Sequence, residues 1–187
     1  YMAYSGSFTK SSTVTTQAIT GLGFQASCII FFSAGNTSAA TWQAGVKQMA
    51  GFWSPFGGGY SVCAAIQDGA GTSNTARSFT DDPVSFVTTS GVLESQAELI
   101  VNADGFDLNW IVNTASTDYI VNFIAFTAAE APLSQVLGWN MPTAGDAVVT
   151  GLTWTPNMVF HIHAGGLVTT TFPAVQTGAA LGFGCMG

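Results

Sequence analysis

The chain has 187 residues, and only 7% of them are charged, against roughly 25% in ordinary soluble domains. Ten acidic residues outnumber three basic ones, which gives a formal net charge of −7. Nucleic acids are bound by clustered Lys and Arg side chains, so we expect no nucleic-acid partner. No stretch reaches the ~20 consecutive apolar residues of a membrane helix, and we expect no membrane partner. The first residues, YMAYSGSFTK, have no basic segment followed by an apolar one, so we expect no signal peptide.

The predicted elements are strands, and no segment has the period of an amphipathic helix. Residues that permit turns bound each apolar run. The expected strands are Ala3–Thr9, Val14–Gly21, Ser27–Ala34, Tyr60–Gln67, Val84–Thr88, Ala97–Val101, Phe106–Val112 and Tyr119–Thr127. Between the third and the fourth, residues 36–59 are expected to form a Gly- and Ser-rich loop, with a short helix or a loop over Thr41–Ala50. The pattern predicts an all-β fold, an antiparallel β-sandwich or jelly roll.

Three cysteines, Cys28, Cys63 and Cys185, make an odd number. Cys28 and Cys63 lie within apolar runs, where a thiol is usually a small buried side chain. We therefore expect free thiols, as in a reducing cytoplasm, with a disulfide as the alternative.

Part of the sequence occurs twice. Thr20-Gly21-Leu22 returns as Thr150-Gly151-Leu152, and both are followed by an aromatic residue, an apolar run and Ala-Gly. A weaker echo relates residues 59–66 to residues 178–186. Self-similarity of this kind indicates duplicated units. We predict one complete sandwich over residues 1–130 and a partial second copy over 131–187, completed by the first unit or by a partner subunit.

Residues with catalytic or metal-binding potential are few. His161 and His163 alternate on one face of a strand and suit two positions of a zinc or copper site. We favour an interface role for them, because no third ligand is near in sequence. Asp104 and Asp107 read as an Asp-Gly turn rather than a calcium loop. Glu94 and Glu98 do not by themselves predict a glycosidase pair. We expect no enzyme activity, no metal and no cofactor.

Aromatic residues give a second set of candidates. Trp110 and Trp154 lie beside apolar strand residues and are expected in the core. Three others lie in loop-like sequence and are expected at a protein interface, which favours exposed aromatics. Sugar stacking by these loop residues is the alternative. The interface candidates are Trp42, Trp53, Phe56 and Trp139, together with the two histidines.

Two motifs carry a resemblance. Gly23-Phe24-Gln25-Ala26 leads into the strand at residues 28–32, and Trp154-Thr155-Pro156 leads into Val159-Phe160. Asp104–Trp110 followed by Tyr119–Phe126 matches the motif that closes the same unit. Together they resemble the tandem β-sandwich structural proteins of tailed bacteriophages. The chain departs from that pattern at Ala26, where a proline is usual, and in its shortened second unit.

The resemblance implies a virion structural protein assembled in the host cytoplasm. Its expected role is a capsid decoration or cement protein that stabilises the shell through apolar contacts. Its expected partners are capsid or other virion proteins, and further copies of itself in an oligomer or lattice. The alternative is a phage tail or fibre module that binds a receptor or glycan.

Overall fold

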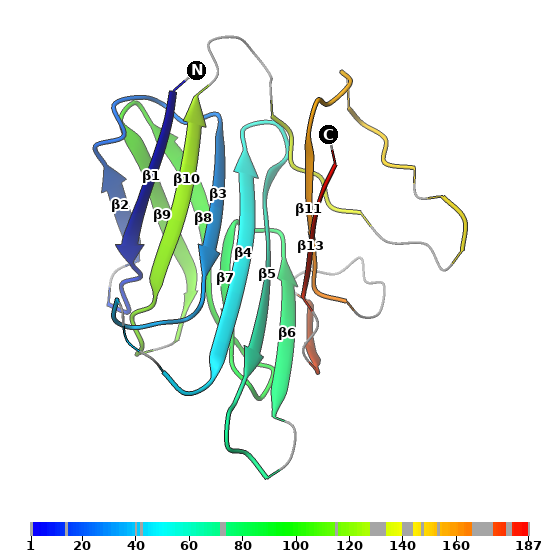
Figure 1. Cartoon of the computed structure of the whole chain (residues 1–187). Helices are drawn as coiled ribbons and strands as arrows, with labels where there is room; N and C mark the ends of the chain where they lie inside the picture. Colours follow the sequence, from blue (N-terminus) through cyan, green and yellow to red (C-terminus); the bar gives the residue numbers. More distant parts are fainter. Residues whose placement is uncertain are drawn as a thin grey trace.

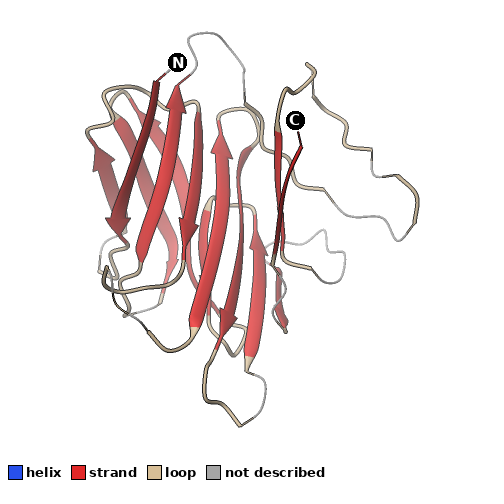
Figure 2. Cartoon of the chain, viewed as in Figure 1, coloured by secondary structure: helices blue, strands red, loops and turns tan. Residues whose placement is uncertain are grey.

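The computed structural model describes most of the chain between Met2 and Met186. The described residues are 2–13, 15–39, 41, 43–71, 74–114, 116–127, 134–139, 144–146, 148–152, 154–165, 174–178 and 181–186. These residues form strands, turns and loops without a helix (Figure 2). The helix alternative for Thr41–Ala50 is therefore wrong, and so is the loop expected over residues 36–59, because a strand runs from Val46 to Ser54. Over the described residues there is no helix long and apolar enough to span a membrane.

A seven-stranded antiparallel sheet forms one layer of the molecule (Figure 1). Its strand order is β1-β10-β3-β4-β5-β6-β12. The bounds are β1 (Met2–Thr9), β10 (Ile120–Thr127), β3 (Cys28–Ser33), β4 (Val46–Ser54), β5 (Gly58–Ile66), β6 (Thr75–Thr80) and β12 (Ala174–Thr177). The strands from β3 to β6 follow one another as a meander, so this half of the sheet is made of local pairings.

A four-stranded antiparallel sheet lies behind the first and has the order β2-β9-β8-β7 (Figure 1). The bounds are β2 (Thr16–Thr20), β9 (Gly105–Asn113), β8 (Leu93–Asn102) and β7 (Val84–Val87). The two sheets make a sandwich, which confirms the predicted all-β antiparallel fold. A separate two-stranded hairpin joins β11 (Val159–His163) to β13 (Gly182–Met186).

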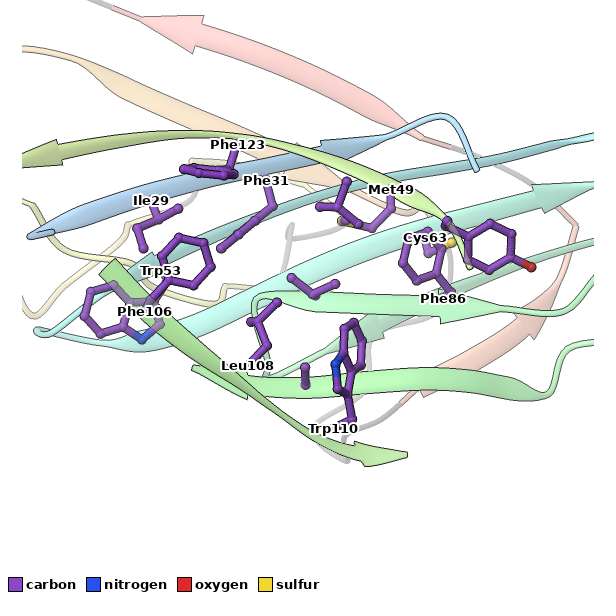
Figure 3. Close-up of a cluster of buried hydrophobic side chains, with 14 of the residues drawn as sticks. Ile29, Phe31, Met49, Trp53, Cys63, Phe86, Phe106, Leu108, Trp110 and Phe123 are labelled. Atoms are coloured by element: carbon purple, nitrogen blue, oxygen red, sulfur yellow. The ribbon is translucent and has the colours of Figure 1, made fainter. Parts of the chain in front are cut away.

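Aromatic side chains from both sheets fill the space between them (Figure 3). Phe106 of β9 meets Phe31 edge-on at 5.6 Å between ring centroids and Phe123 at 5.2 Å. Strand alternation explains this burial, because Phe106, Leu108 and Trp110 point inward while the residues between them do not. Trp110 lies in this core, as predicted.

The sequence repeat has a counterpart in backbone geometry. Gly21 and Gly151 both have a left-handed φ, of 89° and 99°. β3 follows Gly21, and β11 follows Gly151. Each of these strands also has a glycine opposite its middle: Gly51 of β4 pairs with Phe31, and Gly184 of β13 pairs with His161. If the two copies are aligned by this pairing, β13 of the second copy corresponds to β4 of the first. The weaker sequence echo instead relates β13 to residues 59–66, which form most of β5. The tandem copy itself stays a prediction.

Several described contacts join the C-terminal third to the first sheet. β12 pairs with β6, and Arg77 Nη1 donates to the Gly178 carbonyl at 2.8 Å. Val136 N donates to Ser54 Oγ at 3.2 Å. Ser134 Oγ donates to the Ser27 carbonyl at 2.5 Å. The described residues at 134–136 thus reach the neighbourhood of the β4–β5 turn, and those at 174–178 reach the β6 edge of the sheet.

Candidate interaction surface

The hairpin of β11 and β13 exposes large apolar side chains. Met158, Phe160, Phe183 and Met186 are each between 52% and 61% exposed, and we call these four residues the hairpin surface. Phe160 and Phe183 share one face of the hairpin, because Phe183 pairs with Ile162, whereas Met186 pairs with Val159 on the opposite face. An isolated exposed apolar residue is ordinary, but a group of them marks a site of interaction. The sequence adds that Asp146 carries the only charge between Ala131 and Gly187. The hairpin surface is therefore suited to contact with another apolar surface.

A shallow depression extends this surface onto the large sheet. It has a volume of about 410 Å³ and lies between Phe183 of β13 and the outer side of β3 and β4. Phe32 and Val46, both more than two-fifths exposed, line it together with Asn122 of β10. Because the lining is mainly apolar and open, it fits an apolar side chain of another molecule better than a small polar ligand.

The histidines lie on β11 as expected, on one side of the strand. The ring of His161 lies over Gly184 and that of His163 over Gly182, close enough that a β-carbon on either glycine would overlap the imidazole. A larger residue at either glycine would displace the ring that covers it. No group of three potential metal ligands occurs in the described part of the chain, and an interface role for the pair stays a prediction.

The aromatic candidates separate into four cases. Phe56, in the turn between β4 and β5, is 46% exposed, and Trp139 is 41% exposed, so both are accessible to a partner. Trp42 lies outside the described residues. The expected exposure of Trp53 is wrong, because Trp53 is 7% exposed and belongs to the core beside its pairing partner Ile29. Trp154, expected in the core, is only partly buried in a bend before β11.

A polar cluster was not anticipated from the sequence. Lys47 of β4 donates from Nζ to Glu94 Oε2 of β8 and, at 2.6 Å, to the hydroxyl of Tyr119. Tyr119 in turn donates to Glu94 Oε1 at 2.7 Å. All three side chains are mostly buried at one end of the sandwich. The only sequence signal for it is the scarcity of basic residues, of which Lys47 is one of three.

The environment fixes the protonation of Lys47 and Tyr119. Burial lowers the pKa of Lys47, but the hydrogen bonds to Glu94 and Tyr119 outweigh it and raise the pKa above the usual value. Burial also raises the pKa of Tyr119. Both groups therefore stay protonated at neutral pH, and neither supplies a ready base. A cavity of about 270 Å³ borders Lys47 and Tyr119, but the cluster itself is arranged as a structural ion pair.

The remaining acidic candidates do not assemble into a catalytic pair. Glu94 points into the sandwich, whereas Glu98 is exposed on the outer side of the same strand. Asp104 closes a turn instead: its carboxylate accepts from Gly21 N and Gly23 N, and its carbonyl accepts from Leu22 N. Asp107 projects from the outer side of β9, facing Ala18.

Comparison of the chain with family models, with curated proteins and with solved structures finds no match. The assignment of a role therefore depends on the surfaces described above.

Proposed function

We propose that the chain is a structural protein of a virion, most simply a capsid decoration or cement protein. The observation that carries the proposal is the hairpin surface, which exposes Phe160, Phe183 and two methionines in a segment with a single charge. A surface of this composition is stabilised by being covered. The resemblance of the sequence motifs to phage β-sandwich structural proteins supports the same role.

The mechanism is mechanical. Burial of apolar surface contributes roughly 25 cal/mol per Å², so Phe160 and Phe183, about half of whose surface is still exposed, contribute about 1.5–3 kcal/mol together when seated against a neighbouring subunit. A lattice repeats such a contact many times, and linked contacts strengthen one another without any new chemistry. The sandwich then serves as a rigid body that presents the hairpin surface and the adjoining depression to capsid subunits.

A receptor- or glycan-binding module is the competing proposal, and we favour it less. It relied on exposed tryptophans for sugar stacking, and the core position of Trp53 removes one of them. The two aromatic loop candidates that remain exposed lie on different segments, Phe56 in the β4–β5 turn and Trp139 beyond β10. Sugar platforms need aromatics that share one flat face, whereas protein interfaces do not.

Co-sedimentation with capsid shells tests the proposal. Shells are assembled from the major capsid protein encoded on the same genome and mixed with the purified chain. We expect the wild-type chain to sediment with them, and Phe160→Ser combined with Phe183→Ser to weaken binding at least tenfold, since about 1.4 kcal/mol suffices for that change.

The matched control carries Ile100→Ser and Ile111→Ser. Both residues are at least 49% exposed on the outer side of the four-stranded sheet, so the control removes two apolar side chains far from the hairpin surface and should bind as wild type. A wild-type chain that stays in the supernatant would refute the proposal.

A further inference from the structure

The free edge of β1 is unlike the other edges of the two large sheets. β1 has eight residues, MAYSGSFT, with no charge and no proline. It pairs with β10 in unbroken register from Met2 to Thr9. Among the described residues, no strand pairs with its other side, and it lies at the left-hand edge of the seven-stranded sheet in Figure 1.

The other edges carry features that discourage pairing. β12, which covers β6, has four residues, and β2 has five. β7 has four residues, a register shift between Phe86 and Val87, and Pro83 immediately before it. Short strands, bulges and proline are the usual means of blunting an edge. The edge of β1 has none of them, although an exposed, long and uncharged edge readily pairs with another strand.

We propose that β1 pairs with β1 of a second copy of this chain, forming a dimer with one continuous sheet. A two-fold axis perpendicular to the sheet makes the two strands antiparallel, and the interface is then the same patch on both copies. No charge on either strand opposes the approach, in spite of the net charge of −7.

The sequence of β1 is complementary to itself in one register, with Gly6 on the two-fold axis. On the side that faces the four-stranded sheet, Tyr4 then lies opposite Phe8 of the second copy. These rings extend an existing aromatic row, because Tyr4 stacks on Phe123 at 6.0 Å between centroids and Phe8 meets Phe123 at 6.3 Å. Cross-strand aromatic pairs each contribute to sheet stability.

The outer side of the pair is equally compatible. Ser5 lies opposite Ser7 of the second copy, and Ala3 lies opposite Thr9, so small uncharged side chains face one another. At the axis, Gly6 leaves room where its own β-carbon would approach Phe123 to 2.9 Å. The dimer is thus supported by backbone hydrogen bonds along residues 3–7, since the Thr9 carbonyl already accepts from Gln17 Nε2 at 2.7 Å, and by aromatic contacts on its inner side.

Sedimentation velocity with a charge-reversal control tests the dimer. We expect twice the mass of one chain for the wild type at high micromolar concentration. Ser5→Lys with Ser7→Lys places like charges opposite one another and should give a folded monomer that still unfolds cooperatively, because both side chains are exposed. Thr16→Lys with Ala18→Lys adds the same charge on the outer side of β2, where both side chains are also exposed, and should remain dimeric.

Cross-linking tests the register. In a Cys185→Ser background, Ser5→Cys and Ser7→Cys are prepared separately. Opposed residues bring their Cβ atoms to about 4.5–5.5 Å, whereas diagonal neighbours stay about 7–8 Å apart, beyond the reach of a disulfide. Mixing the two variants under oxidising conditions should therefore give a linked dimer that neither variant forms alone. Linkage of Ser5→Cys to itself would overturn this register.

A monomeric wild type, or a dimer that persists in Ser5→Lys with Ser7→Lys, would overturn the proposal, as would loss of the dimer in the β2 control. These outcomes are separate from the capsid experiment. A dimer held by the hairpin surface would survive the β1 substitutions and dissociate with Phe160→Ser and Phe183→Ser.

Discussion

Lys47 and Glu94 are distant in sequence but form a buried ion pair in a chain that has few charges to place. A buried pair of this kind contributes little by its presence, since desolvation offsets the attraction. Removal of one partner is different, because the other charge is left in the interior without compensation. The pair therefore makes the end of the sandwich sensitive to single substitutions.

Glu94→Gln is expected to lower the free energy of unfolding by about 2–3 kcal/mol, less than for a fully buried pair because the Lys47 side chain is 21% exposed. Urea denaturation followed by tryptophan fluorescence measures the change. Glu98→Gln, on the exposed side of the same strand, is the control and should stay within about 0.5 kcal/mol of wild type. Equal effects of the two substitutions would contradict the role of the ion pair.

Individual residues were predicted well only where strand alternation was visible. In β9 the apolar residues Phe106, Leu108 and Trp110 alternate with the polar residues Asp107 and Asn109. This alternation predicts the burial of Trp110. Trp53 lacks such a signal, because Gly51 precedes it and Pro55 and Phe56 follow, so the segment reads as a loop. Its burial results from the pairing of β4 between β3 and β5, which no local pattern encodes.

At the scale of elements, one side chain joins the end of β2 to the β8–β9 turn. The Asp104 carboxylate accepts from Gly21 N at 3.2 Å and from Gly23 N at 2.5 Å. Hydrogen bonds to a charged acceptor are stronger than neutral ones. These contacts hold the turn at Gly21 and Gly23, both of which have a left-handed φ.

Asp104→Ala is accordingly expected to destabilise the protein by about 1–2 kcal/mol, since the backbone carbonyl of Asp104 keeps its own bonds to Gly21 and Leu22. Thermal unfolding by circular dichroism measures this. Asp107→Ala removes an acid from the outer side of β9, three residues on, and should change stability much less. A larger loss in Asp107→Ala than in Asp104→Ala would show that the turn does not depend on this carboxylate.

The eight strands predicted over residues 1–130 are all present, because each combines an apolar run with flanking turn residues. β4 and β6 were missed for different reasons. β4 contains Lys47, Gln48 and Gly51, which dilute its apolar character. β6 directs Ala76, Ser78 and Thr80 inward, and these small side chains give no hydrophobic signal. Both strands form because neighbours of the sheet pair with them on each side.

At the scale of the molecule, the C-terminal third was expected to be an unfinished unit that something covers. The described contacts place part of it on the large sheet: β12 extends the β6 edge, and residues 134–138 pass the β4–β5 turn. The hairpin surface stays exposed in spite of these contacts. The sequence pattern predicts that apolar surface in this third must be buried against another surface. It does not predict which residues stay exposed, because that depends on how segments distant in the sequence pack against the sheet.

The three thiols are free and lie at three depths, with Cys63 buried between the sheets, Cys28 half-buried and Cys185 exposed. Burial raises the pKa of Cys63 to about 12 and that of Cys28 to about 11, which leaves little thiolate at neutral pH. We expect one rapid reaction with a chromogenic thiol reagent, abolished by Cys185→Ser, and reaction of Cys63 only on unfolding. Rapid modification of two thiols in the native protein would contradict this.

The depth of Cys63 has a practical consequence. A reagent reaches its sulfur only when the two sheets separate. The rate of Cys63 modification therefore reports how often the sandwich opens, without an engineered probe. Comparing the rate of Cys63 modification in the free chain with the rate in an assembled particle would show whether incorporation slows the separation of the two sheets.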